Sequence, residues 1–221
     1  LAPDPLPPDA LPRLAGVPWG HAADWVVVER PVARATAQLW LLPARELAWE
    51  RGANLAGEAR DAADVPPTSA PAWAVVPPGA VRGVGALLRA TQVAGAGARV
   101  LALALAHTAA REQFGRPLSS FQVIQHNLAR LACAVTAVDG VTLAGWEAIG
   151  ACGLPGARRG GRGDAWLYAA AAKVAASDRV EELTALGHQL HGAMGFTAEH
   201  ALQFATRRLF AWRAEWGTGA E

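Results

Sequence analysis

The chain has 221 residues, of which 52% are hydrophobic and 18% are charged, with 20 basic against 19 acidic residues. This composition excludes a disordered polar chain, and a net charge of +1 excludes the strongly basic surface of nucleic-acid-binding proteins. Uninterrupted apolar runs such as 100–106 are short, so we expect no membrane partner. Cys133 and Cys152 have neither disulfide nor metal-ligand spacing, and we interpret both as small apolar fillers.

Proline divides the chain into two parts. Thirteen of the 15 prolines lie before residue 80. Proline in a helix interior costs roughly 3 kcal/mol, so this part is not mainly helical. Short β-branched or aromatic runs at 24–29, 38–42 and 73–76 predict strands instead. We therefore predict a partial small β domain over 1–80, with a proline-rich lead-in at 1–12.

Alanine and leucine dominate after residue 80, and both favour helices. Long helices with short connections are typical of an up-down four-helix bundle, so we predict a mainly α fold with a helical domain over 81–221. Pro117 is expected just inside the start of the second helix. The many small residues predict tight helix packing or oligomer contacts. The helices are expected near 82–112, 118–151, 164–190 and 196–214.

A cluster of polar and aromatic residues follows the first predicted helix. Arg111, Gln113 and Phe114 come first, and Phe121 and Gln122 follow at the start of the next helix. Arginine binds phosphate with a planar fork, glutamine reads polar ring edges and phenylalanine supplies a flat surface, so the set suits a nucleotide-like ligand. The alternative is a plain helix end, with Arg111 placed on the helix dipole and Phe114 buried beneath the turn.

A second cluster precedes the last predicted helix and contains Gln189, His191, Gly192 and Ala193. Glycines that flank a helix break allow the backbone to approach a ligand closely. Thr197 is placed to cap the next helix over a bound phosphate. The alternative is a glycine-assisted turn between two helices, which requires no ligand.

Taken together and in this order, the two clusters resemble the acyl-CoA dehydrogenase family. The resemblance rests on R-E-Q-F-G-R-P-L-x-x-F-Q-x-I-Q at 111–125, the helix around Lys173, Q-L-H-G-A-M-G-F-T at 189–197, and Arg207 with Arg208. It covers residues 81–216 strongly and residues 16–60 weakly.

The resemblance implies a cytoplasmic flavoenzyme of fatty acid metabolism. Such an enzyme removes hydrogen from the α and β carbons of an acyl-CoA thioester, with FAD as the hydride acceptor and no metal. The family holds the ADP half of FAD across a subunit interface, so the chain is expected to form homo- or hetero-oligomers. The residues that the resemblance assigns to FAD are Arg111, Gln113, Phe114, Phe121, Gln122, Gln189, His191, Gly192 and Ala193.

The catalytic base of the family does not align with a carboxylate in this chain. The usual glutamate directly precedes Gly-Thr near the C-terminus, and Trp216 stands at that position. Glu215 is one residue away, which turns a helical side chain by about 100°, so it is the candidate base only if the backbone shifts. Some members place the base at the start of the first bundle helix, where this chain has Gly85.

Several functions remain open at this point. One possibility is a subunit that contacts flavin while a partner supplies the base. The others are a homomeric dehydrogenase that uses Glu215 and a flavin-dependent monooxygenase or oxidase of the same fold. A degenerate non-catalytic partner subunit and a non-enzymatic scaffold also fit these residues. Because the sequence begins at Leu1 and its single methionine is Met194, we expect it to be the back part of something longer.

Overall fold

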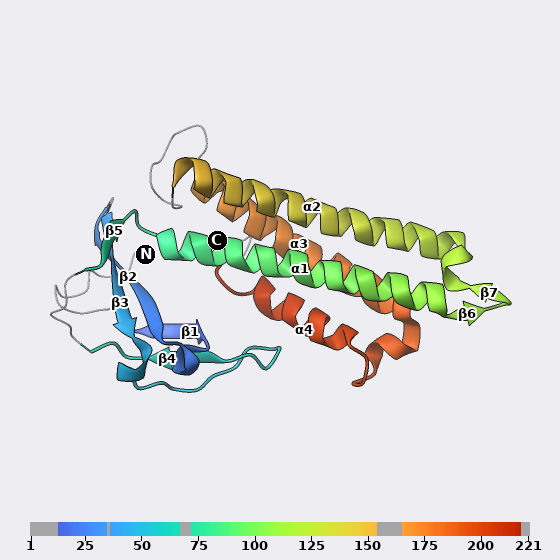
Figure 1. Ribbon diagram of the computed structural model, residues 1–221, viewed down its shortest axis with the longest axis horizontal. Coiled ribbons are helices and arrows are strands. Elements are labelled where there is room, and N and C mark those ends of the chain that lie inside the picture. The colour runs from blue at the N-terminus through green and yellow to red at the C-terminus, as the bar shows by residue number, and fades with distance from the viewer. Residues whose placement is uncertain (1–12, 35, 67–71, 154–164, 218–221) are drawn as a thin grey trace.

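The computed structural model describes residues 13–34, 36–66, 72–153 and 165–217. In these residues, small antiparallel sheets lie at one end of a bundle of long helices (Figure 1). The predicted fold class is therefore confirmed. The predicted lead-in at 1–12 lies outside the described residues, and the division into two domains at residue 80 stays a prediction.

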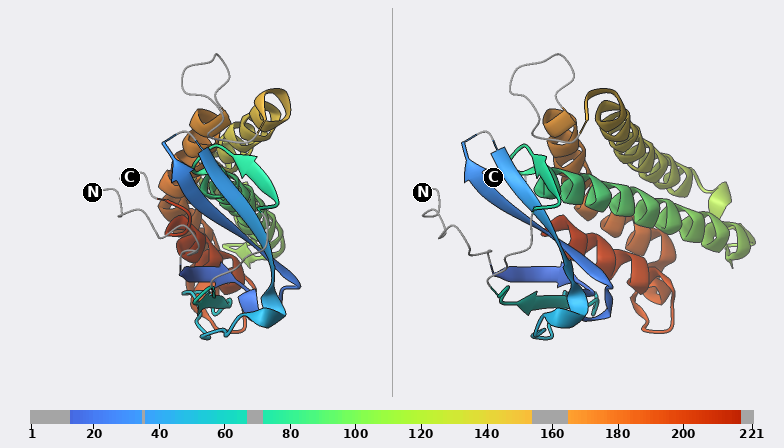
Figure 2. Two further views of the ribbon diagram at one scale, coloured as in Figure 1. Left: turned by 90° about the vertical axis from the view of Figure 1, so that its left-hand side faces the viewer. Right: turned by 60° about the vertical axis from the view of Figure 1, so that its left-hand side comes forward.

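Five strands form two sheets in the N-terminal part. β1 pairs with β4, and β2, β3 and β5 form a second antiparallel sheet in the order β2-β3-β5. Figure 2 shows β2 and β3 as a long ribbon that runs from the start of α1 toward β1 and β4. The bounds are β1 Leu14–Pro18, β2 Trp25–Ala33, β3 Thr36–Pro43, β4 Arg60–Ala63 and β5 Ala74–Val76.

The three predicted strands correspond to β2, β3 and β5, whereas no sequence pattern predicts β1 or β4. These two strands contain a single β-branched residue, Val17, and are held in place by pairing between distant segments, with Val17 opposite Asp61. In β2, Val26 and Val28 alternate with exposed neighbours and pack on Trp40 of β3. This alternation gives the β region its own small core.

In the described residues from 72 onward, four α-helices run alternately up and down the bundle (Figure 1). α3 packs against both α1 and α2, and α4 packs against α1 and α3. A short hairpin of β6 (Glu112–Gln113) and β7 (Arg116–Pro117) joins α1 to α2 at the end of the bundle away from the β region. The helix bounds are α1 Ala80–Ala110, α2 Gln122–Cys152, α3 Ala165–His191 and α4 Leu202–Arg213.

Two predicted helix starts are wrong. α2 begins at Gln122 rather than at 118, because Pro117 belongs to β7 and the 3-10 turn η3 (Leu118–Ser120) comes between them. α4 begins at Leu202 rather than at 196, because a second 3-10 turn, η4 (Gly192–Phe196), ends the preceding helix.

The interpretation of the cysteines as apolar fillers is also wrong. Cys133 and Cys152 both lie on α2, as expected, and both are free thiols. Both side chains are exposed, so neither fills space in the core.

Glu29 of β2 ties the β region to the bundle. Its carboxylate accepts hydrogen bonds from the backbone N–H groups of Gly79 and Val81, the latter at 2.9 Å. N–H groups in the first turn of a helix have no partner within that helix, and a carboxylate also suits the positive end of the helix dipole. The sheet therefore fixes where α1 starts.

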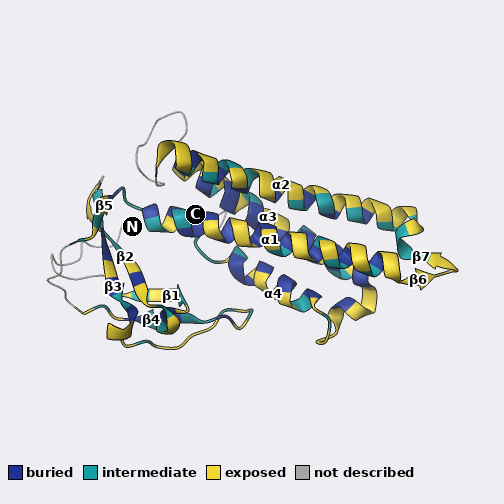
Figure 3. Cartoon of the chain, in the orientation of Figure 1, coloured by how far each residue is buried: buried dark blue, intermediate teal, exposed yellow. Residues whose placement is uncertain are grey.

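Glycines allow the helices of the bundle to approach one another closely. A Cβ at Gly187 of α3 would lie 2.6 Å from Cγ1 of Val100 on α1. A Cβ at Gly145 of α2 would lie 2.6 Å from Cδ1 of Leu87. Buried residues recur along each helix (Figure 3), in agreement with the tight packing that the small residues predict.

By length and composition alone, α1 and α2 could each cross a membrane, with mean hydropathy 1.4 over the relevant window. An argument from uninterrupted apolar runs misses them, because glycine and polar residues interrupt the runs. This is weak evidence, since core helices pass the same test, and in the described structure both helices pack against α3. The absence of a membrane partner stays a prediction.

The contact at Gly187 gives a test of the packing. Gly187→Ala should lower the free energy of unfolding by about 1–3 kcal/mol, because the β-branched Val100 cannot turn away from the added methyl group. Gly140→Ala is the matched control in α2, where no atom lies within 4 Å of the new Cβ, and it should raise stability by up to about 1 kcal/mol. Urea unfolding measures both, and equal effects of the two substitutions would contradict the packing.

Candidate functional site

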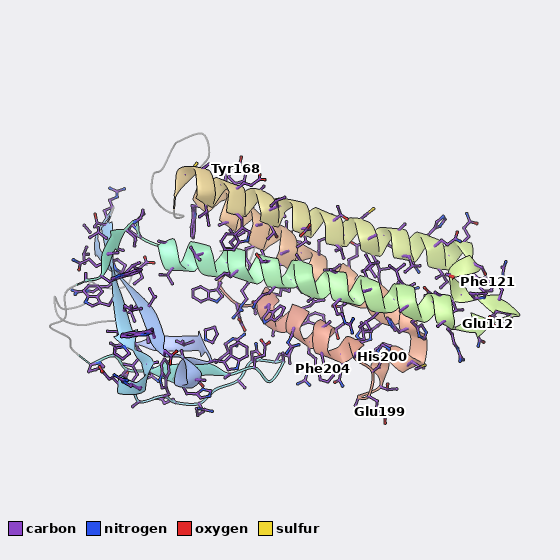
Figure 4. All side chains as sticks on the ribbon, viewed as in Figure 1. Glu112, Phe121, Tyr168, Glu199, His200 and Phe204 are labelled. Carbon is purple, nitrogen blue, oxygen red and sulfur yellow. The ribbon has the colours of Figure 1, made fainter. Side chains whose placement is uncertain are left out.

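A cavity of about 280 Å³ lies at the end of the bundle that carries the β6–β7 hairpin. Its wall combines the ends of α1 and α3 with the hairpin and the start of α2. Figure 4 labels Phe121 and His200 at this end of the molecule. The lining residues are His107, Arg111, Gln113, Leu118, Ile124, Gln189, Leu190, His191, Gly192, Ala193 and Met194.

The end of α1 brings two basic side chains to the cavity. His107 and Arg111 are four residues apart, so they lie on one face of the helix. The N–H of Arg111 donates to the backbone oxygen of His107 at 2.8 Å, which closes the last turn. Gln113 follows in β6, and the turn at Phe114 and Gly115, both with positive φ, returns the chain toward α2.

The end of α3 supplies Gln189, His191 and an open stretch of backbone. His191 is 3% exposed, and its Nδ1 donates to the backbone oxygen of Gly187 at 2.7 Å. Gly192 has a φ of 58°, a left-handed conformation that favours glycine. No atom lies within 4 Å of where its Cβ would be, so a ligand can approach this backbone closely.

Six of the nine residues predicted to bind the cofactor line this one cavity. Phe114, Phe121 and Gln122 do not line it, and their role stays a prediction. Phe114 is 92% exposed and meets Phe121 edge-on at 6.2 Å between ring centroids. The alternative that buries Phe114 beneath the turn is therefore wrong. The six lining residues are Arg111, Gln113, Gln189, His191, Gly192 and Ala193.

Sequence reasoning missed His107 at this end of the bundle, although its four-residue spacing to Arg111 is a signal that identifies it. The second sequence cluster extends to His200, which sequence reasoning considered only as a weak zinc ligand with His191. Thr197 is not the cap of α4: its Oγ1 donates to the backbone oxygen of Met194 at 3.0 Å, and the helix begins later. Instead, Nδ1 of His200 accepts a hydrogen bond from the N–H of Leu202, the first residue of α4, at 3.2 Å.

Glu215, the candidate base, lies where the bundle meets the β region. Its Oε1 accepts hydrogen bonds from Asn54 at 3.0 Å and from Arg60 Nε at 2.8 Å. Its Oε2 accepts from Arg60 Nη2 at 3.1 Å and from Arg89 Nε at 2.6 Å. A carboxylate has about four acceptor positions, and these four donors fill them.

A second carboxylate, Glu58, extends this network. It accepts hydrogen bonds from Asn54 and Arg60 at 3.0 Å, from Arg208 at 3.0 Å and from Trp212 Nε1 at 2.8 Å. Burial by itself raises the pKa of Glu58, but these hydrogen bonds outweigh burial and hold the pKa below its ordinary value. Glu58 therefore stays charged at neutral pH and links β4 to α4.

The two positions that the resemblance assigns to the base, Trp216 and Gly85, contact each other. Trp216 has a φ of 63°, and a Cβ at Gly85 would lie 2.3 Å from Cε3 of the indole. The indole thus packs directly on the backbone of α1, which is possible only because Gly85 has no side chain. Neither position presents a carboxylate.

Lys173 holds the end of α4 from within the bundle. It is 3% exposed and donates to Ser177 Oγ and to the backbone oxygen of Arg213, both at 2.8 Å. Burial lowers the pKa of Lys173 to about 8; the charge of Glu215 opposes this shift, and the positive charges of Arg89 and Arg213 add to it.

The cavity and the contact between Gly85 and Trp216 lie at opposite ends of α1. Gly85 and Arg111 are separated by 26 residues, or about 39 Å along the helix at 1.5 Å per residue. A ligand in the cavity is therefore remote from the base positions of the same chain. Within the part of the chain that the structure describes, no three His, Cys, Asp or Glu side chains gather as a metal ion would require.

The fold and these two clusters define a member of a known enzyme family. The sequence profile of the acyl-CoA dehydrogenase C-terminal domain matches residues 83–220. The chain therefore belongs to the acyl-CoA dehydrogenase family.

Two relatives of known name are similar in sequence. Acyl-CoA dehydrogenase IpdE2 of Mycobacterium tuberculosis is 33% identical over 123 residues, which cover 56% of this chain and 34% of the relative. The 3-sulfinopropanoyl-CoA desulfinase of Paraburkholderia xenovorans is 32% identical over 143 residues, which cover 60% of this chain and 34% of the relative. The chain thus spans about a third of the length of these relatives.

Solved structures share the fold over nearly the whole chain. The ChsE4-ChsE5 complex from Mycobacterium tuberculosis has a TM-score of 0.75 at 20% identity, covering 94% of this chain and 56% of that one. The Tcur3481-Tcur3483 steroid ACAD variant has a TM-score of 0.74 at 23% identity, covering 97% and 58%. Butyryl-CoA dehydrogenase from Megasphaera elsdenii has a TM-score of 0.75 at 20% identity, covering 95% and 57%.

The family typically binds FAD, and the residues of the cavity fit its ADP half. Arg111 supplies a cation for the diphosphate, and Gln113 and Gln189 supply amides for polar ring edges. The open backbone at Gly192 allows close approach, and the buried Nε2 of His191 has no hydrogen-bond partner among the described residues. A polar ligand would provide that partner.

The network around Glu215 gives a prediction about stability. Glu215→Gln should lower the free energy of unfolding by roughly 3 kcal/mol, because it leaves the buried guanidinium groups of Arg60 and Arg89 without their shared carboxylate. Glu147→Gln, at an exposed position of α2, is the matched control and should change stability by less than about 0.5 kcal/mol. Urea unfolding of both variants tests this, and equal stability of the two would rule out a structural role for Glu215.

The pKa of Lys173 gives a prediction about pH. Between about pH 8 and 10.5 the unfolded chain keeps the Lys173 proton that the folded chain has lost, so the unfolded state binds more protons and stability rises with pH. The free energy of unfolding of the native chain should therefore rise relative to Lys173→Met across this window. Because Lys173 is the only lysine in the chain, no other lysine contributes. A difference that stays constant with pH would contradict the assignment.

Proposed function

We propose that this chain is the flavin-binding subunit of a heteromeric acyl-CoA dehydrogenase. In this proposal the chain holds the ADP half of FAD in the cavity lined by Arg111 and His191. A partner chain supplies the base for α,β-dehydrogenation of an acyl-CoA thioester. FAD, when bound, supplies the hydride acceptor.

The observation that carries the proposal is the contact between Trp216 and Gly85. The family's two base positions meet in space, and an indole packed on glycine backbone fills them. A base must lie within hydrogen-bond reach of the proton that it removes, and indole and glycine have no basic group. Removal of the α-proton therefore falls to a different chain.

The competing proposal makes Glu215 the base of a homomeric enzyme. Its four acceptor positions are taken by Asn54, Arg60 and Arg89, two of them buried cations. To reach a substrate, the carboxylate would have to leave both arginines. Arg60 would keep Glu58, but the buried Arg89 would lose its carboxylate partner, which costs several kcal/mol. This energetic cost favours a structural role for Glu215.

The length of α1 supports a shared flavin site. The cavity and the base positions of one chain are about 39 Å apart along the helix, so the reactive half of a ligand in the cavity would meet a second chain. Two of the structures with this fold are named as pairs of different chains, ChsE4-ChsE5 and Tcur3481-Tcur3483. A hetero-oligomer is the arrangement that fits both facts.

The residues of the cavity would act on the cofactor by binding and orienting it. The guanidinium of Arg111 would pair with the diphosphate, and the backbone at Gly192 would approach it closely. Phe114, in the exposed turn of the hairpin, and the half-buried Phe121, just before α2, lie together at this end and would meet the adenine or the neighbouring subunit. In this proposal, none of these side chains transfers a proton from the acyl group.

The test is co-expression with a second acyl-CoA dehydrogenase family chain from the same genome, one that has glutamate directly before Gly-Thr. The purified assembly should contain FAD and oxidise acyl-CoA, whereas this chain alone should not. Arg111→Gln in this chain should weaken FAD binding about tenfold or more, because one charge-assisted hydrogen bond is lost. Arg99→Gln is the matched control, an exposed arginine on α1 that does not line the cavity.

Each competing function has its own outcome in the same experiment. The homomeric enzyme would be established if this chain alone oxidises acyl-CoA and Glu215→Gln abolishes the activity per bound FAD. Oxygen consumption with reduced flavin and no response to acyl-CoA would establish a monooxygenase or oxidase. A stable assembly without flavin would leave a non-catalytic partner or scaffold as the function.

A further inference from the structure

Beside the cavity, the ring of His191 contacts histidine rings from two other segments. His107 comes from α1, His191 is the last residue of α3, and His200 lies in the turn before α4, where Figure 4 labels it. The rings of His107 and His191 are stacked with centroids 5.0 Å apart. The ring of His200 meets His191 edge-on at 4.7 Å, so His191 is the centre of the cluster.

The hydrogen bonds fix where the hydrogen of His191 lies. A carbonyl oxygen only accepts, so Nδ1 must carry the hydrogen in the 2.7 Å contact with Gly187. In the neutral ring, Nε2 is then a bare acceptor. This atom is buried and has no partner among the described residues, in a side chain that lines the cavity. A proton on Nε2 would turn it into a donor and leave the bond to Gly187 intact.

While the cavity holds no anion, the surroundings of the cluster disfavour protonation of His107 and His200. Burial lowers the pKa of His107, and the charges of His191, His200 and Arg111 lower it further. Burial also lowers the pKa of His200, with His191 as the second cause.

Of the described residues around the cluster, Glu199 directly precedes His200 but does not line the cavity. On α3, the pKa of His188 is lowered by burial and by His191, while a hydrogen bond between its ring and the backbone of Gly195 opposes the shift. The described residues that line the cavity include no carboxylate. An anion in the cavity would therefore be the negative charge that this group of imidazoles and Arg111 lacks.

We propose that the histidine cluster takes up a proton when a diphosphate enters the cavity, and that His191 Nε2 then donates to a phosphate oxygen. This rests on the proposed function, which puts the ADP half of FAD in the same cavity. His107 and His200 are the positioning residues, because their rings contact the ring of His191. The proton comes from solvent, and no other bond is made or broken.

The consequence is an affinity that depends on pH. Each proton taken up makes the affinity fall by up to about tenfold per pH unit as pH rises through the window where only the bound form is protonated. A hydrogen bond from a charged imidazole to phosphate is also roughly twice as strong as a neutral one.

The experiment is isothermal titration of the full chain, alone and in the co-expressed assembly freed of flavin, with ADP-ribose. This probe has a diphosphate without a terminal phosphate that titrates near neutral pH. Titrations in buffers of different ionisation enthalpy give the number of protons bound with the ligand. We expect uptake of about one proton near pH 7 and an affinity that falls several-fold per pH unit above it.

Three variants separate the cluster from the rest of the cavity. His191→Asn keeps a donor for the Gly187 oxygen and removes Nε2, so proton uptake and the pH dependence should disappear. His107→Gln removes a neighbouring ring that competes for charge, so the pH window should move upward while uptake persists. His126→Asn, at an exposed histidine of α2 that does not line the cavity, should behave like the native chain.

The outcomes distinguish this inference from the function on which it rests. ADP-ribose binding without proton uptake, and with an affinity independent of pH, would overturn the histidine proposal and leave the flavin site standing. No binding in either preparation would refute the flavin site, and the histidine proposal with it. If His191→Asn fails to fold, the shift of the window in His107→Gln still decides the question, because an unmoved window would contradict the cluster.

Discussion

The buried ion cluster of Glu58, Arg60, Arg89 and Glu215 is the contact on which the rest of the structure depends. Its members come from β4 and the residue two positions before it, from α1, and from the segment after α4, so no single element satisfies its own charges. A buried charge that loses its partner costs several kcal/mol. Separating the β region from the bundle would therefore cost several kcal/mol of free energy. Together with Glu29 at the start of α1, the cluster holds the two parts in a fixed relative position.

The hydrogen bonds of Glu215 in this cluster also explain the contact between Trp216 and Gly85. Because Glu215 is held by four donors, the next residue must leave α4 in a fixed direction, and Trp216 follows with positive φ. The indole can take that place only because α1 offers the bare backbone of Gly85. A side chain at residue 85 and an aromatic ring at residue 216 exclude each other. The two departures from the family pattern are therefore one structural feature.

Much of the fold follows from local sequence, and much of the site does not. Proline and alanine content predict the β region and the four helices because each acts on its own stretch of backbone. β1 and β4 escape prediction because Val17 and Asp61, which pair across the sheet, are 44 residues apart. Six cavity residues are predictable because they lie in two short motifs. The partners of Glu215 are not, because Asn54, Arg60 and Arg89 are more than 120 residues away and only the fold brings them together.

The length of α1 allows binding and proton abstraction to be separated within the family. Substitutions more than 7–10 Å apart without shared partners act independently, as general experience with double mutants shows. The cavity residues His107 and Arg111 lie roughly 33–39 Å along the same helix from Gly85, on which Trp216 packs. The base positions can thus be filled by an indole while the cavity keeps its arginine, amides and histidines. Under the proposed function, a chain of this kind stays necessary to its assembly, because the cofactor shared with the partner would depend on the cavity at the end of α1.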